Sequence, residues 1–133
     1  FHHLPTADAS IDRGLSTEAF FIASEPLEML EEIRRLLRSG GTFFCAVNFF
    51  KESEQSHRWR ERIDLPMYLW SQQEYRTLFR KSGLSVATQD TIPDEDIDIP
   101  PESEFPTEEW ETRAAMIDRY RTWGTLLTVG VAP

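Results

Sequence analysis

The segment LLRSGGTFFCAVNFF, Leu36–Phe50, decides the fold that we expect for this chain. In its second part, Thr42–Phe50, neither alternating face is consistently polar, which is typical of a strand in a sheet that helices cover on both sides. Gly40 and Gly41 stand directly before that strand, and glycine is the usual residue just past the end of a helix. The segment therefore predicts a tight helix-to-strand turn and an α/β layered fold.

The elements around the central strand follow from the same kind of pattern. Apolar residues recur at helical spacing behind Pro26, arginines fill the last turns up to Arg38, and Gly40 is expected to end that helix. Ser71 and Glu74 form a capping-box pattern at the start of another helix. The expected elements are a strand over Ile11–Ser16, a helix over Pro26–Arg38, a strand over Thr42–Phe50, a helical excursion or lid over Lys51–Trp70, a helix over Ser71–Gly83, a strand over Leu84–Ile92, a loop over Pro93–Pro106, a helix over Thr107–Trp123 and a strand over Thr125–Val131.

Length and composition fit one domain over residues 1–133, because 133 residues with 40% apolar side chains can bury a single core. The sequence has no run of about eighteen apolar residues and no secretion signal in its first residues. We therefore expect a cytoplasmic protein with no membrane partner. Cys45 is the one cysteine, and its place in the apolar run predicts a small buried hydrophobe.

The chain is strongly acidic. It has 23 acidic and 14 basic residues and a formal net charge of −9, which works against nucleic acid as a partner. Lys51 and Lys81 are the two lysines, so arginine supplies most of the positive charge. This composition resembles that of proteins from salt-loving organisms; a GC-rich genome together with one acidic loop explains it equally well.

No local motif for phosphate binding, hydrolysis or zinc binding occurs: GxGxxG, GxxxxGK[ST], GxSxG, HExxH and CxxC are all missing. Asp94, Asp96 and Asp98 have the spacing of the first ligands of a calcium loop, but the glycine and the closing glutamate of that loop are missing. His57 has no second histidine or cysteine at ligand spacing. We therefore predict no metal site and assign no catalytic residue.

The candidate site lies where the two predicted parallel strands end, because ligands of such sheets bind outside the carboxyl ends of the strands. Those ends fall at Ser16–Glu18 and Asn48–Phe50. Asn48 is the one amide in an apolar run, so it either meets a ligand at this edge or only caps the strand. The sequence leaves both interpretations open.

Five short pieces follow one another in order between Leu4 and Phe43: Leu4-Pro5, Asp8, Ser10-Ile11-Asp12, Glu25-Pro26 and Arg35-Leu36-Leu37-Arg38-Ser39-Gly40-Gly41. As a set they resemble the second half of the catalytic domain of class I S-adenosylmethionine-dependent methyltransferases, of the methyltransferase type 11-like kind. Ser71–Gly83 and the final strand fit the same resemblance. The glycine-rich loop and the ribose-binding acidic residue of that family precede its Leu-Pro loop and do not occur in this sequence. The chain is therefore similar to the C-terminal portion of such a domain.

The resemblance implies a partial Rossmann-like methyltransferase sheet, made of the last four strands with flanking helices in a three-layer αβα arrangement. It implies S-adenosylmethionine as the cofactor, although without the glycine-rich loop this chain alone is expected to bind it weakly. The residues that it implies at the cofactor are His3, Leu4, Pro5, Ser16, Thr17 and Glu18. The residues that it implies at the methyl acceptor are Asn48, Phe49, Trp59, Met67 and Trp70.

Methyl transfer is an in-line displacement that needs orientation and exclusion of water more than acid–base groups. We therefore expect the intact protein to methylate a small-molecule acceptor, with this chain on the substrate side. A different interpretation is a non-enzymatic partner or dimerisation module that retains half of a methyltransferase fold. Without the preceding strands of the family's sheet, the strand Ile11–Ser16 would present a free edge, and a free edge favours self-association.

The excess negative charge leads to a prediction about salt. Self-repulsion among nine surplus negative charges is screened by ions, with a Debye length of roughly 10 Å at 0.1 M and roughly 3 Å at 1 M salt. The melting temperature should therefore rise between about 0.1 and 2 M potassium chloride, followed by circular dichroism. A flat or falling curve would favour the explanation from a GC-rich genome.

Overall fold

A computed structural model describes residues 5–17, 20, 23–63 and 66–133 of the chain. The strands are β1 Ile11–Thr17, β2 Leu37–Val47, β3 Ser85–Ile92 and β4 Thr125–Val131. The α-helices are α1 Pro26–Leu36, α2 Glu54–Arg62, α3 Gln72–Ser82 and α4 Arg113–Ile117. A short 3-10 helix, η2 Glu102–Glu104, and a π-helical segment, η3 Asp118–Trp123, complete the order.

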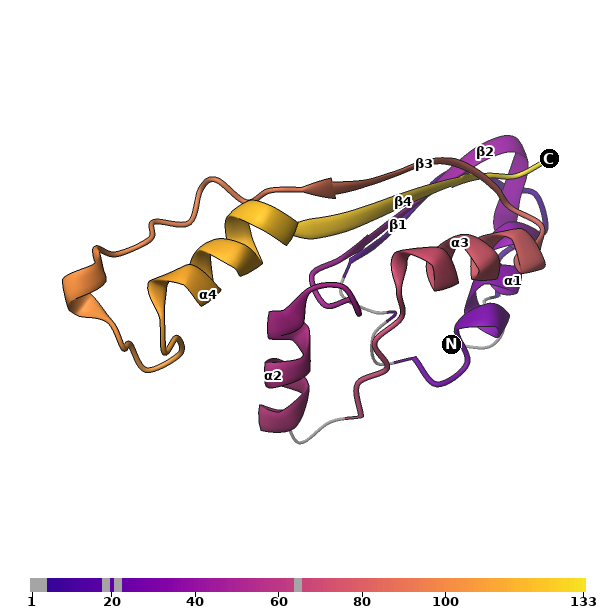
Figure 1. Cartoon of the computed structure of the whole chain (residues 1–133). Helices are drawn as coiled ribbons and strands as arrows, with labels where there is room; N and C mark the ends of the chain where they lie inside the picture. The colour runs from indigo at the N-terminus through magenta and orange to yellow at the C-terminus, as the bar shows by residue number, and fades with distance from the viewer. Residues whose placement is uncertain (1–4, 18–19, 21–22, 64–65) are drawn as a thin grey trace.

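The strands form one mixed sheet in the order β1-β2-β4-β3. β1 runs parallel to β2, whereas β4 lies antiparallel between β2 and β3. The last strand of the chain therefore occupies an inner position, and Figure 1 shows it between strands that come much earlier. β1 and β3 are the two edges of the described sheet, as the sequence predicts for the edge of β1.

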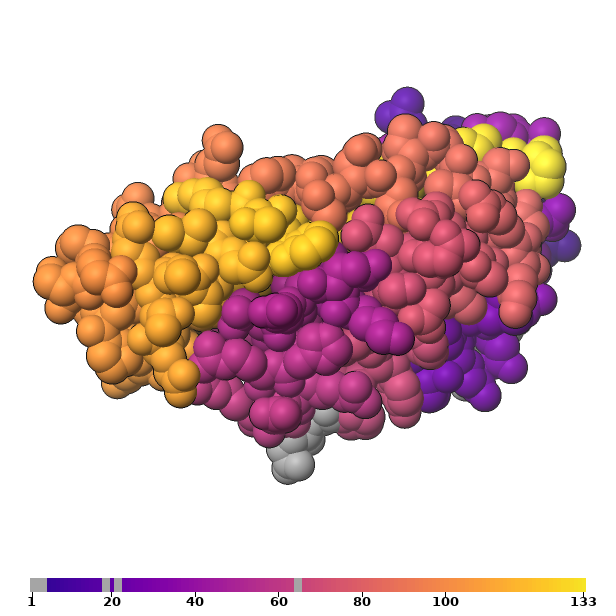
Figure 2. Space-filling view, in the orientation of Figure 1, coloured from indigo at the N-terminus to yellow at the C-terminus, as the bar shows by residue number. Residues whose placement is uncertain are grey.

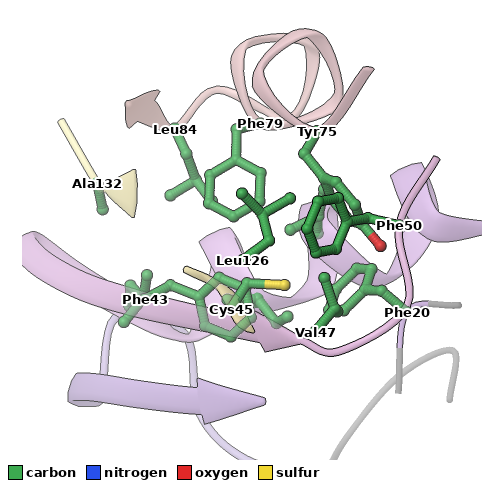
Figure 3. Close-up of a cluster of buried hydrophobic side chains, with 13 residues drawn as sticks. Phe20, Phe43, Cys45, Val47, Phe50, Tyr75, Phe79, Leu84, Leu126 and Ala132 are labelled. Carbon is green, nitrogen blue, oxygen red and sulfur yellow. The ribbon is translucent and has the colours of Figure 1, made fainter. Parts of the chain in front are cut away.

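The core lies between the sheet and the two helices α1 and α3, which pack against each other on one face (Figure 1). Alternate residues of β2 point into it, and the Phe43 ring stacks on the Phe79 ring of α3 with the centroids 5.9 Å apart. Figure 3 shows these side chains with Leu84 and Leu126 around them. Each such buried side chain contributes about 1.5–3 kcal/mol to stability. Cys45 is buried in this cluster, as the sequence predicts.

The opposite face of the sheet is less covered. Phe44 and Ala46 alternate with the core residues of β2 and are half-buried, and Leu15 on β1 is 71% exposed. The mixed sheet with flanking helices confirms the predicted α/β class. The sheet and the helices that gather on one of its faces make up two of the three expected layers.

The glycine pair does not end the helix, which is a correction to the sequence analysis. α1 ends at Leu36, and β2 begins at the next residue and runs through both glycines. Gly40 has a left-handed φ of +79°, and a Cβ on Gly41 would lie 2.8 Å from a backbone carbonyl, so this part of the strand is irregular. Gly40 N donates to Ala132 O, and Ala132 N donates to Gly41 O, both at 2.9 Å. Pairing with the end of the chain therefore makes the pair part of β2.

The starts of two helices were also predicted, one at Ser71 and one at Thr107. The capping box at Ser71 is confirmed, since its hydroxyl accepts from Glu74 N at 3.0 Å and the Glu74 carboxylate accepts from Ser71 N at 3.2 Å. The helix expected from Thr107 starts only at Arg113. Thr107 instead closes a turn, because its hydroxyl accepts from Trp110 N at 2.9 Å, and a local hydroxyl bond of this kind competes with the helical one.

The glycine before β4 generates a prediction. A Cβ at Gly124 would lie 2.0 Å from Ile92 O, at a backbone φ of +65°, whereas a Cβ at Gly40 would meet nothing within 4 Å. Gly124→Ala should therefore lower the free energy of unfolding by about 3 kcal/mol or more, from a clash and backbone strain together. Gly40→Ala should cost only the left-handed strain of about 1–2 kcal/mol. Denaturant unfolding measures both, and equal losses would contradict the close approach at Gly124.

Candidate functional site

The carboxyl ends of β1 and β2 lie side by side, as the sequence analysis expects. In the parallel ladder Ser16 pairs with Cys45 and Thr17 with Ala46, so the last residues of β1 stand next to those of β2. The Ser16 side chain is half-buried, the Thr17 side chain is exposed, and Asn48 follows two residues beyond Ala46. Hydroxyl and amide groups of two strands thus lie at the same end of the sheet.

The Asn48 side chain has a hydrogen-bond partner in the first residue of β4. The hydroxyl of Thr125 donates to Asn48 Oδ1 at 2.7 Å, and both residues are half-buried. This bond ties the end of β2 to the start of β4. This bond supports the interpretation that Asn48 caps the strand. The side chain also lies at the carboxyl end of β2, which is where the interpretation as a ligand-binding residue places it.

Beside Asn48, the Phe49 ring faces a buried cation. The guanidinium carbon of Arg119 in η3 lies 5.9 Å from the centroid of the Phe49 ring and 5.1 Å from that of Tyr120. Arg119 is 7% exposed and donates to Gly124 O at 2.9 Å. The contact of Arg119 with the Phe49 ring holds η3 against the end of β2.

α2 and the segment before α3 form the excursion that the sequence predicts over residues 51–70. Phe50 N donates to Ser56 Oγ of α2 at 3.1 Å, and Lys51 N donates to Trp70 O at 3.0 Å, so both ends of the excursion are anchored beside β2. Trp59 is half-buried on α2, and Met67 is 3% exposed.

Trp70 stands out among the predicted acceptor residues. Its ring stacks on that of Tyr68 with the centroids 6.2 Å apart, and it lines a hollow of about 250 Å³. Its indole N–H is buried and has no hydrogen-bond partner within the part of the chain that the structure describes. A buried donor without a partner costs about 1–3 kcal/mol, so an acceptor atom from a ligand would be stabilising here.

The predicted cofactor side is described in part. His3, Leu4 and Glu18 lie outside the described residues, and Pro5 is exposed at the start of the described chain. Arg35 of α1 holds the loop that follows Pro5.

That arginine makes several bonds. It donates to both Glu32 oxygens at 3.0 and 2.5 Å and to Thr6 O at 2.9 Å, and it pairs with Asp8. The hydrogen bonds to Glu32 and then to Asp8 raise the pKa of the Arg35 guanidinium. The segment from Thr6 to Asp8 is therefore fixed against α1.

A carboxylate that sequence reasoning missed, that of Asp118, belongs to the first residue of η3 and lies near Glu54 of α2. Burial raises the pKa of Asp118, and the negative charge of Glu54 in α2 raises it further. Thr125 and Arg119 were missed as well. The partner of Thr125 is 77 residues away in sequence, and an arginine in a helical segment is ordinarily solvated, so no local signal indicated these contacts.

No group of three or more histidine, cysteine or acidic side chains among the described residues could hold a metal ion. None of the described helices is long and apolar enough to cross a membrane.

Comparison with known proteins shows clear likenesses. Residues 1–45 match a family model described as a methyltransferase domain. A candidate methyltransferase from Haloferax volcanii, solved in complex with the Trm112 methyltransferase activator, is 57% identical, with a TM-score of 0.94 over 99% of this chain and 58% of its own. No curated protein matched the sequence.

Two more distant structures share the fold. A geranyl diphosphate methyltransferase with GPP and sinefungin is 14% identical, with a TM-score of 0.68 over 98% of this chain and 50% of its own. A possible histamine N-methyltransferase from Thermotoga maritima is 19% identical, with a TM-score of 0.67 over 99% of this chain and 60% of its own. The chain thus spans between half and three fifths of the length of these three structures.

The raised pKa of Asp118 leads to a pH prediction. The folded chain binds this proton more tightly than the unfolded chain, so the stability from Asp118 is present below the ordinary pKa of 3.8 and is lost as the pH rises through the raised value. Asp118→Asn stays neutral and should melt at a higher temperature than the wild type at pH 7, and the difference should shrink toward pH 4.

The control for this prediction is Asp96→Asn, which makes the same change in net charge at an exposed position. If both variants gain equally at pH 7, the effect comes from general charge repulsion and the half-buried carboxylate of Asp118 has no special role.

Proposed function

We propose that the intact protein transfers a methyl group from S-adenosylmethionine to a small-molecule acceptor, because residues 1–45 match a methyltransferase-domain model and the Haloferax volcanii protein is 57% identical over 99% of this chain. The observation that carries the proposal is that Ser16, Thr17 and Asn48 lie at the carboxyl ends of two neighbouring parallel strands, in a fold shared with the Haloferax volcanii protein at 57% identity. Ligands of such sheets bind outside the carboxyl ends of the strands.

The residues of the cofactor side fit a polar, charged ligand. Ser16 and Thr17 present hydroxyls that both donate and accept, and Arg35 holds the loop after Pro5 in one place. In our proposal Ser16 and Thr17 bind S-adenosylmethionine, together with His3, Leu4, Pro5 and Glu18. When bound, that cofactor supplies the electrophilic methyl group.

The acceptor side that we propose consists of Asn48, Phe49, Trp59, Met67 and Trp70. Asn48 would orient the acceptor with its amide, and the unpaired indole N–H of Trp70 would donate to an oxygen or nitrogen of the acceptor. The aromatic rings would exclude water from the line of transfer. Orientation and exclusion of water are the main needs of such a displacement, so no acid–base residue is required.

We propose a protein partner as well. The Haloferax volcanii protein is described in complex with the Trm112 methyltransferase activator, and 57% identity over 99% of this chain supports the same kind of partner here. Co-expression of the full-length protein with a Trm112-type protein is therefore the form in which to assay it. The free edge of β1 stays a proposed surface for self-association of this chain.

The test uses two variants that break the same hydrogen bond. Asn48→Ala removes the amide, and Thr125→Val removes the hydroxyl that donates to it at 2.7 Å, so each should cost about 1 kcal/mol of stability. Only Asn48→Ala should also lower turnover, by about tenfold or more, since about 1.4 kcal/mol of lost transition-state stabilisation gives that factor.

The assay follows labelled methyl groups from S-adenosylmethionine into a cell extract, divided by dialysis into its small-molecule and macromolecular fractions. Label in the small-molecule fraction supports the proposed acceptor class, and label only in macromolecules would overturn it. Equal turnover of the two variants would make Asn48 a capping residue. No transfer by the complex to either fraction would leave the partner or dimerisation module as the better interpretation.

A further inference from the structure

Arg119 lies beside the proposed acceptor residues, although the proposed function gives it no role. It is 7% exposed, and its guanidinium carbon lies 5.9 Å from the centroid of the Phe49 ring. Arginine is almost never fully buried unless it is paired, because taking its charge out of water is costly. The contacts that hold this cation therefore indicate what it does.

The backbone end of Arg119 is fixed to the residue that precedes β4. Its side chain donates to Gly124 O at 2.9 Å, and its own carbonyl accepts from Gly124 N at 2.8 Å. The bond to Gly124 N spans five residues, as in a π-helix, and π-helical turns often occur at functional sites. Gly124 in turn lies close against Ile92, since a Cβ on this glycine would be 2.0 Å from Ile92 O. Arg119 thus starts from a rigid part of the chain.

The other contacts of η3 reach the residues that follow β2. The guanidinium lies within cation–π distance of Phe49, and the Trp123 ring meets the Phe50 ring edge-on with the centroids 5.9 Å apart. β2 ends at Val47, so the strand ladder does not hold Phe49. Figure 2 shows the orange and yellow segment of α4 and η3 packed against the magenta of α2 and its neighbours. η3 therefore holds the chain just beyond β2.

We propose that Arg119 is a positioning residue that holds the Phe49 ring in place for the methyl acceptor. The inference rests on the proposed function, in which Phe49 belongs to the acceptor side. A ring that is fixed before binding costs the acceptor less ordering entropy than a ring that must be immobilised when the acceptor binds. Loss of Arg119 therefore weakens acceptor binding. The cofactor side is unaffected, because Ser16 and Thr17 lie on β1.

The experiment uses the full-length protein co-expressed with a Trm112-type protein, with labelled S-adenosylmethionine and the small-molecule fraction of a cell extract as the source of acceptor. Dilution series of the fraction and of S-adenosylmethionine give the half-saturating amount of each. In Arg119→Met the half-saturating amount of the acceptor fraction should rise about fivefold or more, as expected for loss of a desolvated cation–π contact. The half-saturating concentration of S-adenosylmethionine and the maximal rate per folded molecule should stay within about twofold.

Arg121→Met is the matched control. Arg121 is a half-buried arginine of the same segment η3, but it donates to the carbonyls of Asp94 and Ile97. Its loss removes the same charge and leaves backbone carbonyls without their donor, yet all three kinetic quantities should stay within about twofold of wild type. Arg119→Lys keeps the charge without the planar group, so it should recover part of the acceptor affinity. It also carries the test if Arg119→Met does not fold.

A second readout does not depend on activity. In the same complex prepared with isotope-labelled phenylalanine, the backbone amide signal of Phe49 is identified in the magnetic resonance spectrum by its loss in Phe49→Leu. This signal should shift or broaden in Arg119→Met, because the guanidinium contacts the Phe49 ring. It should stay in place in Arg121→Met.

Several outcomes would overturn the inference. A lower melting temperature with unchanged kinetics, or an equal rise in the half-saturating amounts of acceptor and cofactor, would make Arg119 a purely structural residue. The same effects in Arg121→Met, or an unmoved Phe49 signal in Arg119→Met, would also contradict it. Absence of methyl transfer by the wild type counts against the proposed function instead. The Phe49 signal then still decides whether Arg119 holds this ring, while its role toward an acceptor falls with the proposed function.

Discussion

The fold depends on one strand that comes late in the sequence and lies in the middle of the sheet. β4 pairs antiparallel with β2 on one side and with β3 on the other, and without it these two strands would have no contact in the sheet. α3 can approach β4 closely because Gly130 has no side chain, since a Cβ there would lie 2.7 Å from the Phe79 ring. Phe79 therefore has room to stack on Phe43 in the core beside β4.

The same arrangement explains why polar and aromatic residues gather at one end of the molecule. β1 and β2 end where β4 begins, so Asn48 meets Thr125 there, and η3 brings Arg119 between the rings of Phe49 and Tyr120. The segment that joins β3 to β4, residues 93–124, extends from the sheet at this end as well. The buried Arg119 contacts the ring of Phe49 after β2 and the ring of Tyr120 in η3, so it links these two parts of the chain.

Sequence reasoning succeeded where the deciding contacts are local. The capping box joins Ser71 and Glu74, and the apolar pattern of α1 is a property of one helix, so both could be predicted from short segments. The left-handed conformation of Gly40 was also predicted, but its place in a strand was not, because that place is set by hydrogen bonds to Ala132 at the far end of the chain.

The candidate site shows the same limit. Strand-end residues such as Asn48 could be proposed from pattern and resemblance. Its partner Thr125 and the buried Arg119 follow only from the three-dimensional arrangement. The late start of α4 has a local cause, because the backbone N–H of Trp110 donates to the hydroxyl of Thr107 instead of to a helical carbonyl. The apolar residues at helical spacing nevertheless predicted a helix from Thr107.

The central position of β4 also orders the events of folding. The bond between Asn48 and Thr125 joins residues that are 77 positions apart. Closing a loop of this length costs chain entropy, and the contacts that offset this cost form only after the loop has closed. The parallel pair β1 and β2 comes first in the sequence, and until β4 arrives β2 presents one side without a partner. We therefore expect the interior of the sheet to form last, and before it forms the open side of β2 could pair with a wrong strand.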